Sequence, residues 1–264
     1  MSQIELRDVA IEYKKPKSEE RFVAVQGVNL SIEKGSFVTI VGSSGCGKST
    51  LLLSMAGLIP RARGSIRVDG KDVTGPGRDR AMVFQDASLL PWRSVHGNVR
   101  FGLELQRWTR DNVDERAERF IRMVGLANFS DYHPHQLSGG MRQRVNIARA
   151  LAVDPDVLLM DEPFGALDAQ TREVMGDELL RIWERDKKTA IFVTHAIDEA
   201  IFLGDRVVVM GKNPGHIREV IEIDLPRPRT SAMLDSPKFI EYRKRLRDYF
   251  ASDMQSMQMV RDVA

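Results

Sequence analysis

Residues 42–49 carry the strongest chemical signal in the chain. They read Gly-Ser-Ser-Gly-Cys-Gly-Lys-Ser, which matches the phosphate-loop pattern G-x-x-x-x-G-K-[ST] between a β-rich run and an expected helix. Glycines let backbone N–H groups turn inward around phosphate oxygens, and a helix that begins at Lys48 adds the positive end of its dipole. The pattern therefore predicts a loop that binds the phosphates of a nucleotide.

Side chains in and after this loop have separate expected tasks. We expect Lys48 to reach the β- and γ-phosphates, and the hydroxyl of Ser49 to ligate Mg²⁺, which prefers oxygen ligands. Cys46 is interpreted as a small filler of the loop rather than a nucleophile, because the sequence offers it no catalytic partner. The nucleotide-binding residues expected here are Gly42, Ser43, Ser44, Gly45, Cys46, Gly47, Lys48, Ser49 and Thr50.

Two acidic residues end an apolar run further along the chain. Residues 157–160 read Val-Leu-Leu-Met and are followed by Asp161 and Glu162. Because side chains alternate along a strand, the two carboxylates point in different directions. We assign Asp161 to the Mg²⁺ shell and Glu162 to the general base that polarises the attacking water. Acids at a strand end often only cap a helix or face solvent, but a phosphate loop in the same chain favours the catalytic role.

Strands alternating with helices must position these groups. β-rich runs occupy residues 4–13, 22–33, 36–42, 64–73, 81–85, 157–160, 191–194 and 206–210, and helical patterns occupy residues 48–56, 111–124, 138–152 and 168–186. Such alternation predicts an α/β fold with a mostly parallel sheet, while the middle of the chain is mostly helical. Together with the motifs it predicts a P-loop nucleotide hydrolase core.

Composition restricts the remaining function classes. A length of 264 residues with 42% apolar content is sufficient for one large α/β domain with an appendage. The 39 basic and 37 acidic residues give a net charge of +2, which argues neither for nor against a nucleic-acid partner. The sequence has no apolar run near the ~20 residues of a membrane span, and its first ten residues lack the pattern of a secretion signal. We expect the chain to stay in the cytoplasm.

Residues 137–141, Leu-Ser-Gly-Gly-Met, identify the family. Followed by Arg-Gln-Arg, they resemble the signature motif of the ATP-binding cassette (ABC) family. Ser138 can cap a helix, and the bare backbone of Gly139 and Gly140 can approach an anionic phosphate. An isolated Ser-Gly-Gly is commonly an ordinary helix start, but here it lies ahead of the paired carboxylates, in the order that this family uses.

The resemblance extends to other motifs. Gln85 looks like the Q-loop glutamine, which contacts Mg²⁺ and links the site to a permease. His195 looks like the switch histidine, which senses the γ-phosphate and steadies the attacking water. Tyr13 is a candidate for stacking on adenine, with a core or surface tyrosine as the alternative. The segment that resembles the D-loop at the dimer interface contains Ala166, Leu167 and Asp168.

The resemblance covers residues 3–229 and implies how the chain works. It implies two copies that sandwich two ATP molecules, so that Ser138, Gly139 and Gly140 of one copy face the phosphate held by Lys48 of the other. It also implies an antiparallel β subdomain and an inserted helical subdomain. The predicted domains are a nucleotide-binding domain at 1–225, with its helical subdomain at about 87–153, and a linker with a helical tail at 226–264. The expected permease contact consists of Leu89, Leu90, Pro91 and Trp92.

Several short sequence segments resemble one branch of the family. Residues 75–80, 89–92, 161–172 and 226–229 resemble the nitrate, sulfonate and taurine importers. This branch implies separate permease chains, a periplasmic or lipoprotein solute-binding protein, and a peripheral place on the cytoplasmic face of the inner membrane. Met141 and Ala196 depart from the general family pattern, and the second departure affects the tuning of the switch region. Nothing in this chain selects the solute.

Other readings stay open at this point. A non-transport ABC ATPase of DNA repair or translation would usually carry a coiled coil, a zinc insertion or a second cassette. An ABC exporter subunit would have a similar ATPase sequence, and a regulatory scaffold would bind ATP without hydrolysis. The tail is expected to form a helix from Ser236-Pro237 to about Phe250, which either packs on its own domain or dimer mate or binds a membrane or regulator.

Overall fold

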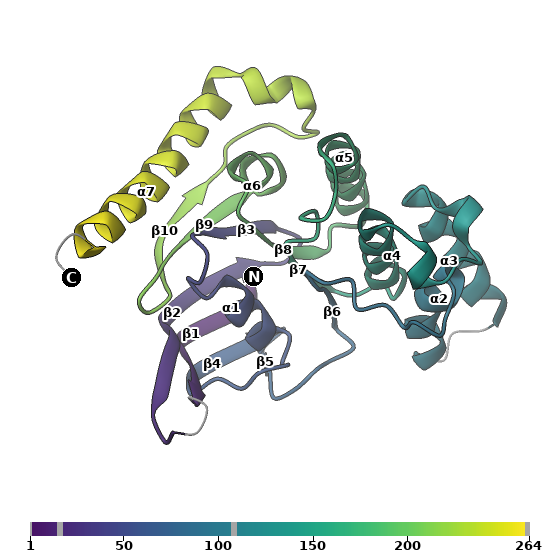
Figure 1. Cartoon of the computed structure of the whole chain (residues 1–264), viewed down its shortest axis with the longest axis horizontal. Coiled ribbons are helices and arrows are strands. Elements are labelled where there is room, and N and C mark those ends of the chain that lie inside the picture. Colours follow the sequence, from purple (N-terminus) through teal and green to yellow (C-terminus); the bar gives the residue numbers. More distant parts are fainter. Residues whose placement is uncertain (1, 15–17, 107–109, 262–264) are drawn as a thin grey trace. The chain divides into compact units, whose positions relative to one another are not determined.

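The computed structural model describes residues 2–14, 18–106 and 110–261 (Figure 1). The chain forms two compact units, of which the first contains Met1–Pro76 and Ile191–Ala264 and the second contains Gly77–Ala190. The second unit is therefore an insertion into the first along the sequence. The strand β8 (Thr189–Thr194) returns the chain to the first unit.

An antiparallel sheet in the first unit contains the start of the chain. Its strand order is β2-β1-β4-β5, and the strands are β1 (Ser2–Lys14), β2 (Arg21–Glu33), β4 (Arg63–Val68) and β5 (Lys71–Asp72). In the long β1–β2 pair Val9 lies opposite Val28, and both are fully buried. The β-branched side chains on this face stabilise the register, because a slip of one residue would expose them.

The core strands of the first unit run in the order β10-β9-β3-β8. β3 (Phe37–Gly42) pairs in parallel with β9 (Arg206–Gly211), which pairs antiparallel with β10 (His216–Glu222). Every residue of β3 is buried, as expected for a parallel strand covered on both faces. The helix α1 (Lys48–Met55) follows β3, and α6 (Ile197–Leu203) follows β8.

The second unit contains one parallel strand pair and most of the long helices. β6 (Arg80–Val83) pairs in parallel with β7 (Val157–Asp161). Between these strands the chain forms α2 (Val95–Leu105), α3 (Arg110–Met123) and α4 (Gly139–Ala152), with the short 3-10 helices η1 (Ala127–Phe129) and η2 (Pro134–Gln136). α5 (Ala169–Asp186) follows β7. The predicted P-loop α/β fold, with parallel and antiparallel strands and a helical insertion, is confirmed.

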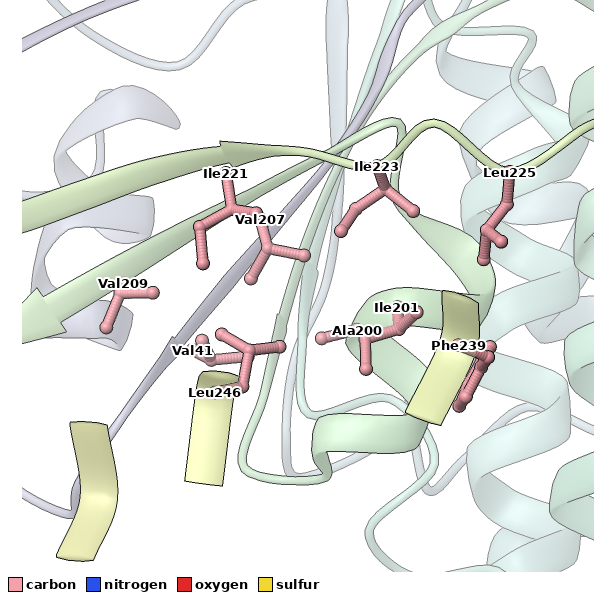
Figure 2. Close-up of a cluster of buried hydrophobic side chains, with 10 residues drawn as sticks. All are labelled: Val41, Ala200, Ile201, Val207, Val209, Ile221, Ile223, Leu225, Phe239 and Leu246. Atoms are coloured by element: carbon pink, nitrogen blue, oxygen red, sulfur yellow. The ribbon is translucent and has the colours of Figure 1, made fainter. Parts of the chain in front are cut away.

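The end of the chain packs on the first unit. After the short 3-10 helix η3 (Ser231–Asp235), α7 (Pro237–Arg261) begins, and Ser236 Oγ accepts a hydrogen bond from the amide of Phe239 at 3.3 Å. Phe239 and Leu246 of α7 are fully buried. Figure 2 shows them in one cluster with residues of β3, α6, β9 and β10. The tail therefore packs on its own domain, which was one of the two open readings.

Several elements differ from expectation. The sequence patterns did not predict α2, α6 or β10, and α7 continues to Arg261, beyond the expected end near Phe250. Neither Gly nor Pro interrupts residues 251–261, so nothing in the local sequence ends the helix earlier. Within the described ranges no helix is long and apolar enough to cross a bilayer.

Candidate functional site

The phosphate loop joins β3 to α1 in the first unit. Gly47 precedes the helix in the left-handed region with φ 91°, and an added Cβ would lie 2.7 Å from Val25 Cγ2. Only glycine fits this position. Gly45 also has positive φ, but no atom lies within 4 Å of the place where its Cβ would be. The loop therefore combines the backbone conformation of a phosphate cradle with open space beside Gly45.

Lys48 is the first residue of α1, and its side chain reaches back into this loop. Its side chain is buried, and Nζ donates hydrogen bonds to the carbonyl oxygens of Gly42 at 2.8 Å and Ser43 at 3.3 Å. Cys46 is fully buried, and its Sγ lies 3.9 Å from Lys48 Nζ. This position is consistent with a small side chain that fills space inside the loop. An ammonium that the backbone holds inside a cradle at the start of a helix suits phosphate oxygens in both charge and position.

Further predicted residues belong to the same unit. Tyr13 is 41% exposed, and its hydroxyl donates to Thr50 Oγ1 at 3.3 Å, which places the ring beside the first turn of α1. His195 is exposed at the end of β8. Ser49 is half-buried in the first turn of α1. A purine ring could stack on the open face of Tyr13.

The paired acids lie at the end of β7 in the second unit. Every residue of β7 is buried, and Asp161 is 6% exposed. Glu162 has φ 42° and is half-buried, and its carbonyl oxygen accepts a hydrogen bond from the amide of Gly165 at 3.0 Å. The left-handed conformation costs a non-glycine residue about 1 kcal/mol or more. Backbone strain of this kind is common at functional residues.

The signature motif forms the start of α4. Ser138 caps the helix by accepting a hydrogen bond from the amide of Met141 at 3.2 Å. Gly139 is exposed, and an added Cβ would meet only Arg142 Nη2, at 3.9 Å. Folding alone therefore does not require glycine at position 139. The first turn contains no acidic side chain, so the N-terminus keeps its positive potential for an anion.

The structure brings the D-loop next to the signature motif. An added Cβ on Gly140 would lie 3.3 Å from Leu167 Cδ2 and 3.5 Å from the carbonyl oxygen of Ala166. Asp168 caps α5, with Oδ1 accepting from the amide of Thr171 at 2.9 Å and Oδ2 from its hydroxyl at 2.7 Å. These hydrogen bonds hold the pKa of Asp168 below its ordinary value.

α4 also holds the segment that contains Gln85. Gln85 itself is exposed after β6, but the carbonyl oxygen of Phe84 accepts hydrogen bonds from the amides of Gln143 and Asn146, each at 3.0 Å. Arg149 donates to the carbonyl oxygens of Ala87 at 3.0 Å and Ser88 at 3.1 Å. The sequence analysis missed these three α4 residues, although their spacing of three, which puts them on one helix face, was a usable signal.

Asn98 fixes the shape of the predicted permease contact. Its Oδ1 accepts from the amide of Leu90 at 2.8 Å, and its Nδ2 donates to the carbonyl oxygens of Leu90, Arg93 and Ser94 at 3.0 to 3.1 Å. Asn98 is fully buried, and the sequence analysis missed it. The turn leaves Trp92 72% exposed, with Pro91 exposed and Leu89 and Leu90 half-buried. A large aromatic side chain in this position is typical of a binding surface.

The residues present are compatible with Mg²⁺ bound together with a nucleotide. Among the described residues no three His, Cys, Asp or Glu side chains form a metal cluster. Mg²⁺ does not need one, because it takes many of its ligands from substrate phosphates and water. Ser49, Gln85 and Asp161 supply oxygen donors of the kind it binds.

Comparisons with known proteins agree with this chemistry. Residues 25–165 match the family model described as ABC transporter. The nitrate import ATP-binding protein NrtD of Synechocystis sp. is 49% identical over 226 residues, which are 83% of this chain and 85% of that protein. The taurine import ATP-binding protein TauB of Rhizobium johnstonii is 47% identical over 229 residues, covering 85% and 87%.

A solved structure is similar at the level of the whole fold. The dimeric ATP-binding cassette MJ0796, described as a post-hydrolysis state bound to ADP and Pi, has a TM-score of 0.78 and 33% sequence identity. The match covers 84% of this chain and all of that one.

Proposed function

This chain belongs to the ABC transporter family and hydrolyses ATP, and we propose that it is the ATPase subunit of an importer, working as a dimer on the cytoplasmic face of a membrane. The observation that carries the catalytic part is Glu162, held in a strained turn directly after the buried Asp161.

In the proposed reaction each residue acts on the bound ATP. Lys48 exchanges its loop carbonyl partners for the β- and γ-phosphate oxygens, and the loop N–H groups orient the phosphates. Glu162 accepts a proton from the attacking water, and His195 steadies that water near the γ-phosphate. Ser49, Gln85 and Asp161 would hold Mg²⁺, which would supply positive charge against the negative charge that develops on the phosphates. Tyr13 stacks on adenine.

The dimer supplies the remaining groups. The exposed backbone of Gly139, with space for a ligand beside it and a helix N-terminus behind it, supports binding of the γ-phosphate held by the second copy. Ala166, Leu167 and Asp168 lie beside this motif, which supports a place at the same interface. The dimeric state of MJ0796 is consistent with this arrangement.

The permease is proposed to bind at residues 89–92. Trp92 is exposed on a turn that Asn98 holds rigidly, and α4 binds the segment that joins this turn to Gln85. ATP at Gln85 could thus be sensed at the docking surface. The similarity to NrtD and TauB supports nitrate or an organic sulfonate as the solute class, delivered by a separate solute-binding protein.

Substitution of Glu162 by Gln tests the catalytic proposal. We expect Glu162→Gln to retain ATP and to lose at least about 100-fold in turnover, because the amide cannot accept the proton. Equilibrium binding of a fluorescent ATP analogue and phosphate release measure the two effects separately. Unchanged turnover would remove Glu162 from the mechanism, and loss of ATP binding would show that the substitution damages the site. Recovery of the importer with its permease and bound solute tests the transport proposal.

A further inference from the structure

The short helix α6 connects His195 to the rest of the first unit. It begins two positions after His195 and contains only seven residues. A helix of this length is not stable by itself in water. Contacts at its two ends and on its buried face must therefore set its position. Any shift of α6 also moves His195.

The N-terminal side of α6 is tied to the residue before His195. The buried hydroxyl of Thr194 accepts a hydrogen bond from the amide of Ala196 at 2.9 Å and donates one to Glu199 Oε2 at 2.6 Å. These two bonds link the end of β8 to the first turn of α6 across His195. The backbone on both sides of His195 is therefore tied to the helix.

The middle of α6 is tied to the strand that leads into the phosphate loop. Thr39 Oγ1 donates to the carbonyl oxygen of Ala200 at 3.1 Å. Thr39 lies on β3, three positions before Gly42. α6 thus adds a second link between the His195 turn and the loop that holds Lys48, beside the direct pairing of β3 with β8.

Arg229 caps the C-terminal end of α6. Its Nη1 donates to the carbonyl oxygens of Ile201 at 2.9 Å, Phe202 at 3.0 Å and Gly204 at 2.7 Å. The side chain is 1% exposed. These carbonyls have no partner within a helix that ends here, and a cation is favourable at the negative end of the helix dipole.

The neighbouring part of the chain reinforces this cap. Arg227 donates to the carbonyl oxygen of Leu203 at 2.8 Å and forms an ion pair with Asp205 at 2.7 Å. α7 covers the same helix, since Phe239 packs with Ala200 and Ile201 (Figure 2). The segment after residue 225, whose role the sequence left open, is therefore part of the support of α6.

We infer that Arg229 is a positioning residue for His195, which acts by fixing the C-terminal end of α6. This inference rests on the proposed role of His195 in hydrolysis. Loss of the guanidinium leaves several buried carbonyls without their donor, so α6 shifts or frays and the imidazole loses its place. The arm at residues 226–229, which lies outside the loops that carry the motifs, thereby has a function in hydrolysis.

The test measures kcat and nucleotide affinity of the full chain with Arg229→Gln. A displacement of about 1 Å at a catalytic group can reduce turnover by up to about 100-fold, and we expect kcat to fall at least about tenfold while the nucleotide Kd stays within about twofold. Arg229→Lys should give an intermediate kcat, because an ammonium keeps the charge but cannot reach all the carbonyls. Should the Gln variant not fold, the Lys variant carries the same comparison.

Two comparisons separate positioning from general destabilisation. In a His195→Ala background, Arg229→Gln should change the residual turnover by less than about twofold, because the two residues act as one unit. Arg61 is the matched control. It is partly buried and donates to the carbonyl oxygens of Gly64 and Val73, in the other sheet of the unit. Arg61→Gln should lower the thermal midpoint without the selective loss of kcat.

The outcomes distinguish this inference from the proposed function. Wild-type turnover in His195→Ala would overturn the role of His195 and the inference with it. Loss of turnover in His195→Ala together with wild-type kcat in Arg229→Gln would overturn the inference alone. So would an equal reduction by Arg229→Gln in both backgrounds, or a loss of kcat in Arg61→Gln equal to that in Arg229→Gln.

Discussion

Asn146 of α4 donates a hydrogen bond of 3.0 Å to the carbonyl oxygen of Phe84, the residue before Gln85. The same oxygen also accepts a bond of 3.0 Å from Gln143. The helix that begins at Gly139 thus holds the segment that carries Gln85, the proposed Q-loop glutamine. Both donors are buried, so the two motifs are expected to move together.

The first prediction concerns these two donors. Gln143→Met and Asn146→Leu keep the side-chain volume, and each should lower the free energy of unfolding by about 1 kcal/mol, since the other donor still serves the Phe84 carbonyl. The double variant should lose about 1 kcal/mol more free energy of unfolding than the two single variants lose together, because the buried Phe84 oxygen then has neither donor. Urea unfolding measures all three. Arg144→Met is the control, because Arg144 donates to Val124 instead, and its effect should add to that of Asn146→Leu.

The second prediction concerns Gly139. The space around its Cβ position is open, and a carboxylate in the first turn favours a helix. Gly139→Asp should therefore fold with an unchanged or higher thermal midpoint, while the new charge repels the γ-phosphate of the partner copy. ATP-dependent dimerisation, measured by light scattering in a Glu162→Gln background, should be lost. Gly139→Ala should retain more of it. Normal dimerisation of the Asp variant would contradict the proposed role in trans.

The third prediction concerns Trp92. Because it is 72% exposed, Trp92→Ser should change the free energy of unfolding by no more than about 0.5 kcal/mol. Binding of the permease should weaken by about 2 kcal/mol or more, as is common for a tryptophan at the centre of an interface. Val174 on α5 is 61% exposed and gives a control in Val174→Ser. Equal permease binding by both variants would place the docking surface elsewhere.

The fourth prediction concerns the pH dependence of the cap at Asp168. Hydrogen bonds from Thr171 lower the pKa of Asp168 in the folded state, so its carboxylate stabilises the fold above its unfolded pKa of about 3.9. This contribution is lost as the pH falls through the lowered folded pKa. Asp168→Asn should therefore have a lower thermal midpoint than the wild type at neutral pH. The difference between the two midpoints should become smaller as the pH is lowered into the acid range.

Asp177 on the same helix provides a control with the opposite sign. Burial, and then the charge of Glu173, raise the pKa of Asp177. Its ionised form therefore disfavours the fold above the raised folded pKa, and the effect disappears below the unfolded pKa. Asp177→Asn should have a higher thermal midpoint than the wild type at neutral pH. A shift of the same sign for both variants would show that the midpoints do not report these carboxyl groups.

Local signals in the sequence predicted many of the elements well. Ser138, Asp168 and Ser236 each precede a helix and cap it through the side-chain oxygen. Such caps depend on residues only three positions apart, so a linear pattern contains the necessary information. α6 and β10 were missed because seven residues are too few for a clear periodicity, and their positions depend on neighbouring strands and on α7.

The sequence by itself determined the chemistry of the chain. The phosphate loop, the paired acids and the signature motif are short segments whose residue types and spacing state what they bind. Only the tertiary structure decided which distant groups support them, such as Asn98, which binds the turn that carries Trp92, and Arg229 on the end of α6. These contacts join residues that are not part of any local sequence motif. They form because buried carbonyls need donors, and folding decides which donor comes within reach.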